Sequence, residues 1–188
     1  MTTRRATLLA LVLTTPLLSP TVLAQQRPGS LAPYVPTPHD VVNRMLELAG
    51  VTQDDVVYDL GCGDGRIVIT AAQRFGARGV GIDFDPDRIA EANANAKRAG
   101  VQHLVTFIEQ DAMAADVSEA TVVTLYLLSS SNMKLRPILT RQLRPASRIV
   151  SHAFRMGDWE PDETRHFDDE LGNPRTIYLW RTDGTVRP

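Results

Sequence analysis

Residues 56–67 read VVYDLGCGDGRI, and this stretch decides the fold. The apolar run 56–60 predicts a buried strand, and the apolar spacing of residues 66–75 predicts a helix. Between them, Gly61, Gly63 and Gly65 allow the backbone to turn tightly and to approach a ligand closely. A glycine-rich loop that follows a strand and opens a helix is typical of ligand-binding α/β proteins.

The alternation of short apolar runs with helical stretches continues on both sides of this loop. Further strands are predicted at 79–82, 104–108, 121–127, 148–151 and 176–181. Further helices are predicted at 38–49, 86–99 and 133–143. Strands that alternate with helices form a parallel sheet covered on both faces. The sequence therefore predicts a Rossmann-like, doubly wound α/β sandwich of about seven strands, of which 176–181 is antiparallel.

Two local details accompany these elements. Thr37 and Pro38 are residue types favoured at a helix N-cap and at the first helical position. The three serines at 129–131 are predicted to lie in a solvated loop.

The charge of the glycine loop restricts the ligand. Asp59 and Asp64 flank the glycines, and acids at these positions would repel a pyrophosphate. The spacing G-x-G-x-G also differs from the G-x-G-x-x-G of dinucleotide enzymes. S-adenosylmethionine carries an ammonium and a sulfonium and no phosphate, so charge favours this methyl donor over NAD. An NAD-dependent oxidoreductase and a glycine-rich turn without a ligand are the alternatives.

Two further acids follow later strands of the predicted sheet. Asp83 ends the strand 79–82, about 20 residues after the glycine loop, where an acid commonly binds ribose hydroxyls. Asp85 is a rival, although its position before Pro86 also fits a helix N-cap. Asp111 follows the strand 104–108 and could accept a hydrogen bond from an adenine amino group. The carboxyl ends of parallel strands are where α/β sheets bind ligands.

The stretch 58–67 resembles motif I of the class I methyltransferases. The segments YVPT (34–37), TLYL (124–127), SH (151–152) and GDW (157–159) resemble the lysine methyltransferases of the mitochondrial ATP synthase c-subunit and their bacterial relatives. The resemblance covers about residues 33–181. It departs at 129–132, where SSSN replaces an expected proline, and at the N-terminus, which lacks the membrane helix expected of the mitochondrial members.

The resemblance implies a role for each matching position. The residues implied to bind S-adenosylmethionine are Asp59, Gly61 and Gly63 at its methionine end, Asp83 at its ribose, Asp111 at its adenine, and Tyr34 within an arm, 34–37, that closes over it. Tyr126 is implied to face the acceptor nitrogen.

The acceptor side can also be argued from the residues themselves. A lysine has a reference pKa of about 10.4 and must lose a proton before methyl transfer, through a base, desolvation or both. Tyr126, His152 and Asp158 are the catalytic candidates and are expected to line one pocket. Trp159, like Tyr34, could present an aromatic face to a cation. The alternatives are a hydrogen-bonded histidine at a strand end for His152 and core packing for Trp159.

The N-terminus has the pattern of a secretory signal peptide. Two arginines precede an apolar run, 6–18, that is shorter than the ~20 residues of a membrane span. Small residues around position 24 then predict cleavage after Ala24. The predicted organisation is a signal peptide (1–24), a linker or arm (25–37) and a methyltransferase domain (38–188). An uncleaved anchor and a mis-assigned start are the alternatives.

This N-terminus predicts an exported, periplasmic or membrane-associated protein, or a cytoplasmic one if the signal is not used. Export conflicts with a methyl donor that is made in the cytosol. Cys62 is the only cysteine, so no internal disulfide can form.

Taken together, the sequence predicts an S-adenosylmethionine-dependent methyltransferase that acts on a lysine of a protein. A small-molecule methyltransferase and a donor-binding protein without catalysis are the alternatives. The formal net charge of −2 gives no indication of a nucleic-acid partner. No cluster of residues has metal-ligand spacing, so no metal is expected.

Overall fold

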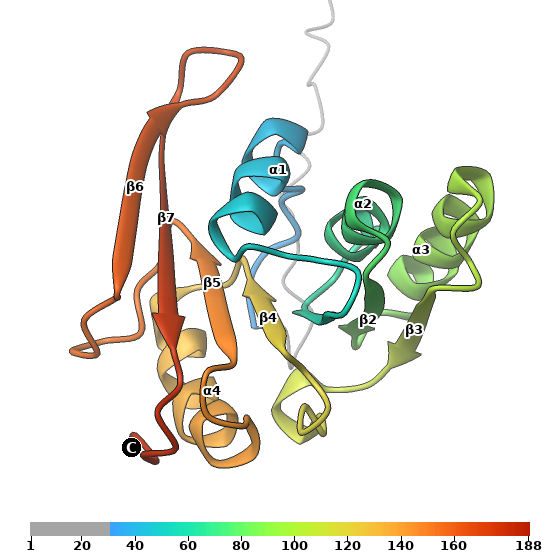
Figure 1. The fold of residues 1–188 in the computed structure, drawn as a ribbon. Helices are drawn as coiled ribbons and strands as arrows, with labels where there is room; N and C mark the ends of the chain where they lie inside the picture. The colour runs from blue at the N-terminus through green and yellow to red at the C-terminus, as the bar shows by residue number, and fades with distance from the viewer. Residues whose placement is uncertain (1–30) are drawn as a thin grey trace, which may run out of the picture.

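Seven strands form one sheet in the order β3-β2-β1-β4-β5-β7-β6 (Figure 1). The computed structural model describes residues 31–188. The strands are β1 (Val56–Leu60), β2 (Arg78–Asp83), β3 (Val105–Glu109), β4 (Val122–Leu125), β5 (Arg148–His152), β6 (Glu163–Asp168) and β7 (Pro174–Arg181). Strands β1 to β5 are parallel, and β7 pairs antiparallel with both β5 and β6. The predicted Rossmann-like sheet, including its antiparallel strand, is confirmed.

Helices cover both faces of this sheet. The helices are α1 (His39–Leu48), α2 (Arg66–Phe75), α3 (Pro86–Ala99), the short 3-10 helix η1 (Ala112–Ala114) and α4 (Ser129–Gln142). Helices α1, α2 and α3 pack on one face, in a core that includes Val57 and Val122. Helix α4 packs on the other face, in a core that includes Leu135 and Trp180 (Figure 1).

Two local expectations are wrong, and one strand was missed. Pro38, not Thr37, is the N-cap of α1, and the Thr37 carbonyl instead accepts a hydrogen bond from Arg66. Helix α4 begins at Ser129, so the serines are helical, and Ser131 is buried instead of lying in a solvated loop. Strand β6 was not predicted, because its residues are mostly polar and exposed and form no apolar run.

The expected signal peptide (1–24) and the first part of the expected linker (25–30) lie outside the described residues. Within residues 31–188, no helix is both long enough and apolar enough to cross a membrane.

A partly buried ion pair joins three parallel strands at their amino ends. Asp55 precedes β1, accepts a hydrogen bond from the Thr121 hydroxyl at 2.6 Å and pairs with Arg148 at the start of β5. Thr121 precedes β4, and its hydroxyl also accepts the Val56 N–H. Burial raises the pKa of Asp55, but hydrogen bonds from Thr121 and Thr52 and the charge of Arg148 outweigh it and hold that pKa below its ordinary value. This network therefore helps to align β1, β4 and β5, whose opposite ends carry the site described below.

We expect Asp55→Ala to lower the free energy of unfolding by about 1.5–3 kcal/mol at neutral pH, because hydrogen bonds to a charged group are lost. Since the folded-state pKa is depressed, Asp55 stabilises the fold above about pH 4, and the difference should shrink as the pH falls further. Urea unfolding at several pH values measures both effects. Glu119→Ala, which removes an exposed pair with Arg144, is the control and should change stability little. Equal losses in the two variants would contradict the assignment.

Candidate active site

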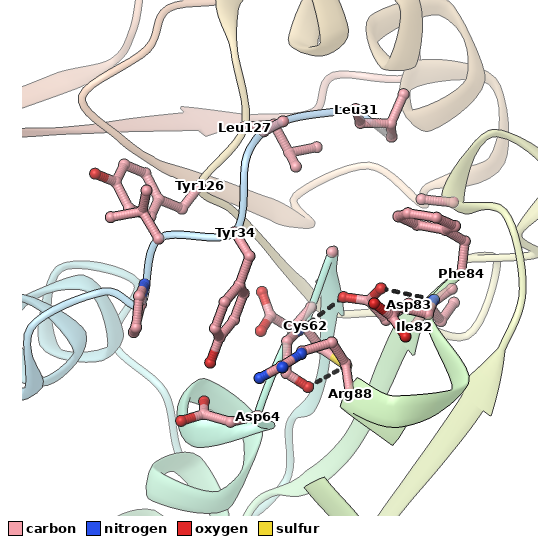
Figure 2. Close-up of a pocket in the computed structure, with 18 of the residues that line it drawn as sticks. Leu31, Tyr34, Cys62, Asp64, Ile82, Asp83, Phe84, Arg88, Tyr126 and Leu127 are labelled. Carbon is pink, nitrogen blue, oxygen red and sulfur yellow. Dashed lines mark hydrogen bonds between the residues drawn. The ribbon is translucent and has the colours of Figure 1, made fainter. Parts of the chain in front are cut away.

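A cavity of about 290 Å³ lies at the carboxyl ends of β1, β2 and β4. Its walls come from the glycine loop, the ends of β2 and β4, Asp111 and the chain segment 31–37. Figure 2 shows Tyr34, Asp64, Asp83 and Tyr126 around this space. The volume lies near the lower end of the ~300–1,000 Å³ typical of small-molecule sites.

The glycine loop is attached to the end of β2. The N–H groups of Gly61 and Cys62 donate to the Ile82 carbonyl, at 2.8 and 3.0 Å. Gly63 donates its N–H to the Asp83 carboxylate at 2.9 Å. Gly63 has φ 52°, and a Cβ atom there would lie 2.5 Å from the Tyr34 ring. Only glycine therefore allows both this turn and the close contact with Tyr34.

The segment 31–37, called the arm below, crosses the cavity and carries Tyr34. Arg66 donates to the Thr37 carbonyl at 2.8 Å and forms a bidentate ion pair with Asp64 of the glycine loop. The Arg88 guanidinium lies 4.3 Å from the centre of the Tyr34 ring. The arm therefore lies directly over the loop.

The acids around the cavity differ in whether a basic side chain neutralises them. Asp59 is 3% exposed and accepts a hydrogen bond from the Thr124 hydroxyl at 2.8 Å. Burial raises the pKa of Asp59 to about 7, with further increases from the charges of Asp83 and Asp64. No basic side chain pairs with Asp59 within the described part of the chain. A cationic ligand would supply the missing charge.

The other acids have structural partners as well. Asp83 accepts N–H bonds from Gly63 and Asp85, one on each carboxylate oxygen. Each oxygen retains a further lone pair that could accept a ligand hydroxyl. Asp111 lines the cavity and caps η1. Asp85 caps α3, so the helix-cap interpretation of Asp85 is confirmed.

Tyr126 brings an aromatic wall to the cavity. Its ring lies 4.1 Å from that of His152 and 6.3 Å from that of Phe154, measured between centroids. His152 is 1% exposed and does not line the cavity, and neither ring nitrogen has a hydrogen-bond partner among residues 31–188. The expectation that His152 lines the pocket with Tyr126 is therefore wrong, and so is its interpretation as a hydrogen-bonded histidine. Burial lowers the pKa of His152 to about 4, so its imidazole is neutral at physiological pH.

The expected position of Asp158 is wrong. Its side chain is 91% exposed, lies outside the cavity lining and pairs with Arg136 of α4. The chain turns after β5 at Ala153, which has φ 64°; Phe154 remains beside Tyr126, whereas Asp158 lies outside the cavity lining. Trp159 also lies outside the cavity lining, and it packs against Trp180, as the core-packing alternative expects.

Sequence reasoning missed two residues that hold the arm. Arg66 could have been noticed as a basic residue next to the acidic loop. Ser131 donates its hydroxyl to the Leu31 carbonyl, 100 positions away, and no local pattern announces such a contact.

Comparison with known proteins identifies the family. The ANTKMT methyltransferase domain matches residues 59–163. A protein-lysine N-methyltransferase of Saccharolobus islandicus is 48% identical over 79% of this chain and 92% of its own length. The chain belongs to the ANTKMT methyltransferase family. It is an S-adenosylmethionine-dependent methyltransferase.

Two further proteins are similar to this chain. The crystal structure of an RNA methyltransferase from Salinibacter ruber in complex with S-adenosyl-L-homocysteine is 57% identical, with a TM-score of 0.76, over 81% of this chain and 97% of that one. The lysine N-methyltransferase of the ATP synthase c-subunit from Xenopus laevis is 31% identical over 69% of this chain, which spans only 57% of that relative.

The cavity of this methyltransferase fits S-adenosylmethionine in two respects. Backbone at Gly61 and Gly63 can approach a ligand closely, because no Cβ atom stands in the way. Asp59 lacks a basic partner among the described residues, and the donor carries an ammonium and a sulfonium.

We expect donor affinity to rise as the pH increases from about 6 to about 8, because ionised Asp59 attracts the cationic donor and its pKa in the free protein is about 7. Binding favours the ionised form, so it should release a proton near neutral pH. Calorimetric titration with S-adenosylmethionine, in buffers of different ionisation enthalpy, measures both quantities. Asp59→Asn should abolish the proton release. A wild-type affinity that does not change with pH would contradict the role of Asp59.

Proposed function

We propose that this methyltransferase transfers the methyl group to a lysine side chain of a protein. The observation that carries the proposal is the ring of Tyr126, which lines the donor cavity and packs against the rings of His152 and Phe154 outside the lining. Aromatic faces attract an alkylammonium. Low-polarity surroundings also lower the pKa of an amine, which favours the loss of its proton. The 48% identical Saccharolobus islandicus relative is named for the same acceptor class.

RNA is the second candidate acceptor, because the Salinibacter ruber protein is named an RNA methyltransferase. The cavity argues against it. Asp59, Asp64, Asp83 and Asp111 line this space together with Arg66, which pairs with Asp64, and Arg88, so acidic groups are in excess. RNA carries a phosphate on every nucleotide, and an excess of acidic groups disfavours a phosphate backbone more than a lysine.

The proposed roles divide between the two sides of the cavity. On the donor side, Asp59, Gly61 and Gly63 bind the methionine end, Asp83 the ribose and Asp111 the adenine, and Tyr34 covers the bound molecule. On the acceptor side, the Tyr126 hydroxyl accepts a hydrogen bond from the lysine amine and its ring excludes water. His152 supports the Tyr126 ring from behind. Asp158, which pairs with Arg136 outside the cavity, has no proposed role.

These residues mainly hold two reactants in line, which is how enzymes accelerate such a displacement. The bound donor supplies a methyl carbon that bonds to the amine lone pair, while its sulfur keeps the electrons of the broken carbon–sulfur bond. The lysine loses a proton to water before the transfer.

Transfer of radiolabelled methyl groups distinguishes the acceptor classes. Denatured casein serves as a lysine probe, total RNA as the nucleic-acid probe, and a low-molecular-weight cell extract as the metabolite probe. Mass spectrometry of cells with and without the protein then locates the natural site. We expect methyllysine in casein. Label found only in RNA or only in metabolites would replace the lysine function.

We expect Asp83→Ala to weaken the binding of S-adenosylhomocysteine roughly 10- to 150-fold, since hydrogen bonds to a charged acceptor contribute about 1.5–3 kcal/mol. Calorimetry measures this directly. Asp54→Ala, an exposed substitution before β1 and outside the cavity lining, is the matched control and should bind normally. An unchanged dissociation constant for Asp83→Ala would refute the ribose role.

Tyr126→Phe should lower kcat without changing the donor dissociation constant, because only a hydroxyl on the acceptor side is lost. Casein methylation at saturating donor gives kcat, and calorimetry gives the donor constant. Tyr178→Phe makes the same chemical change in β7, outside the cavity lining, and should leave both quantities at the wild-type level. A wild-type rate for Tyr126→Phe would show that its hydroxyl does not serve the acceptor.

A further inference from the structure

The first turn of α4 contains two polar residues that are buried next to the cavity. Ser131 is 5% exposed and Asn132 is fully buried. Each donates hydrogen bonds from its side chain to a different segment of the chain. These neighbours therefore connect α4 to two separate parts of the site.

Ser131 holds the beginning of the arm. Its hydroxyl donates to the Leu31 carbonyl, while Arg66 donates to the Thr37 carbonyl at the other end. Tyr34 lies between these two attachment points, with its ring against Gly63. The arm is thus held near both ends over the donor cavity, and the hydroxyl of Ser131 contributes to the attachment at Leu31.

Asn132 holds the turn that follows β5. Its Nδ2 donates to the Phe154 carbonyl at 3.1 Å and to the Ser151 hydroxyl at 3.2 Å. Ser151 donates to the same carbonyl at 2.6 Å. Ala153, between Ser151 and Phe154, has φ 64°. It lies in a tight turn closed by a hydrogen bond from the Phe154 N–H to the His152 carbonyl.

An alanine at positive φ is strained, and such a turn persists only where surrounding contacts hold it. The side chain of Asn132 supplies two of these contacts. Because the turn fixes both His152 and Phe154, Asn132 also fixes the aromatic surroundings of Tyr126.

We propose that Ser131 and Asn132 are positioning residues for the two substrates: Ser131 holds the arm over the donor, and Asn132 holds the turn whose rings pack against Tyr126, the residue that faces the acceptor. The acceptor half of this inference rests on the proposed function. Neither residue lines the cavity itself, so both act through the segments that they hold.

Two measurements on the full chain should distinguish the role of Ser131 from that of Asn132. Ser131→Ala should raise the dissociation constant of S-adenosylhomocysteine about 2- to 10-fold, the effect of one lost hydrogen bond. Its kcat for casein at saturating donor should stay within about twofold of wild type. Ser131→Thr keeps the hydroxyl and should restore donor affinity.

Asn132→Leu should do the reverse. This substitution removes both hydrogen bonds of the Asn132 amide at nearly constant side-chain volume. We therefore expect kcat/KM for casein to fall about tenfold, while the affinity for S-adenosylhomocysteine stays within about twofold. Ser151→Ala removes one donor to the same carbonyl and should give a smaller change in the same direction. It also serves as the test if Asn132→Leu does not fold.

The proposal fails if Ser131→Ala binds S-adenosylhomocysteine normally, or if Asn132→Leu and Ser151→Ala methylate casein normally. It also fails if Ser131→Ala and Asn132→Leu each change donor affinity and casein methylation to the same extent. Hydrogen exchange at residues 153–155 gives a readout independent of the acceptor. Exchange should accelerate in Asn132→Leu and not in Ser131→Ala. A wild-type protein that binds donor but leaves casein unmodified would count against the lysine function alone, because donor affinity and exchange still decide the two assignments.

Discussion

The hydrogen bonds from the glycine loop to the end of β2 are the contact on which the site depends. Parallel pairing places Leu60 opposite Ile82, so the loop after β1 meets the end of β2. The Ile82 carbonyl and the Asp83 carboxylate then accept three consecutive N–H groups of the loop. Asp83 consequently has two tasks, since the carboxylate proposed to bind ribose also shapes the loop. A substitution there disturbs the wall and the ligand contact together.

The charge balance of the cavity depends on which of its acids has a basic partner. Arg66 neutralises Asp64 and ties the arm to the loop, whereas Asp59 has no basic partner in the described chain. Burial raises the pKa of Asp59 so far that its carboxyl is partly protonated at neutral pH before the donor binds. A cationic donor completes this charge distribution, and an anionic cofactor would oppose it. The same logic that separated S-adenosylmethionine from NAD in the sequence therefore holds in the folded protein.

Local signals explain which elements could be predicted. Residues 66–75 and 86–99 are helices with the predicted bounds, because Gly76 and Gly100 end them in the left-handed conformation. The start of α4 could not be predicted, since serines are weak helix formers and the residues that stabilise them lie far away in the chain. The prediction for Asp158 failed for a related reason. Its carboxylate pairs with Arg136 of α4, 22 positions away in the chain, and no local pattern indicates that contact.

The two halves of the site therefore have different origins. The donor half is built from a continuous motif and the ends of two adjacent strands, so similarity in sequence carries its chemistry reliably. The acceptor half is built from contacts between α4, the turn after β5 and Tyr126, which are distant in the chain. Relatives at 48% and 57% identity accordingly share a methyltransferase name while being named for different acceptors. The ring of Tyr126 and the excess of acidic groups in the lining both favour a cationic amine over a phosphate backbone.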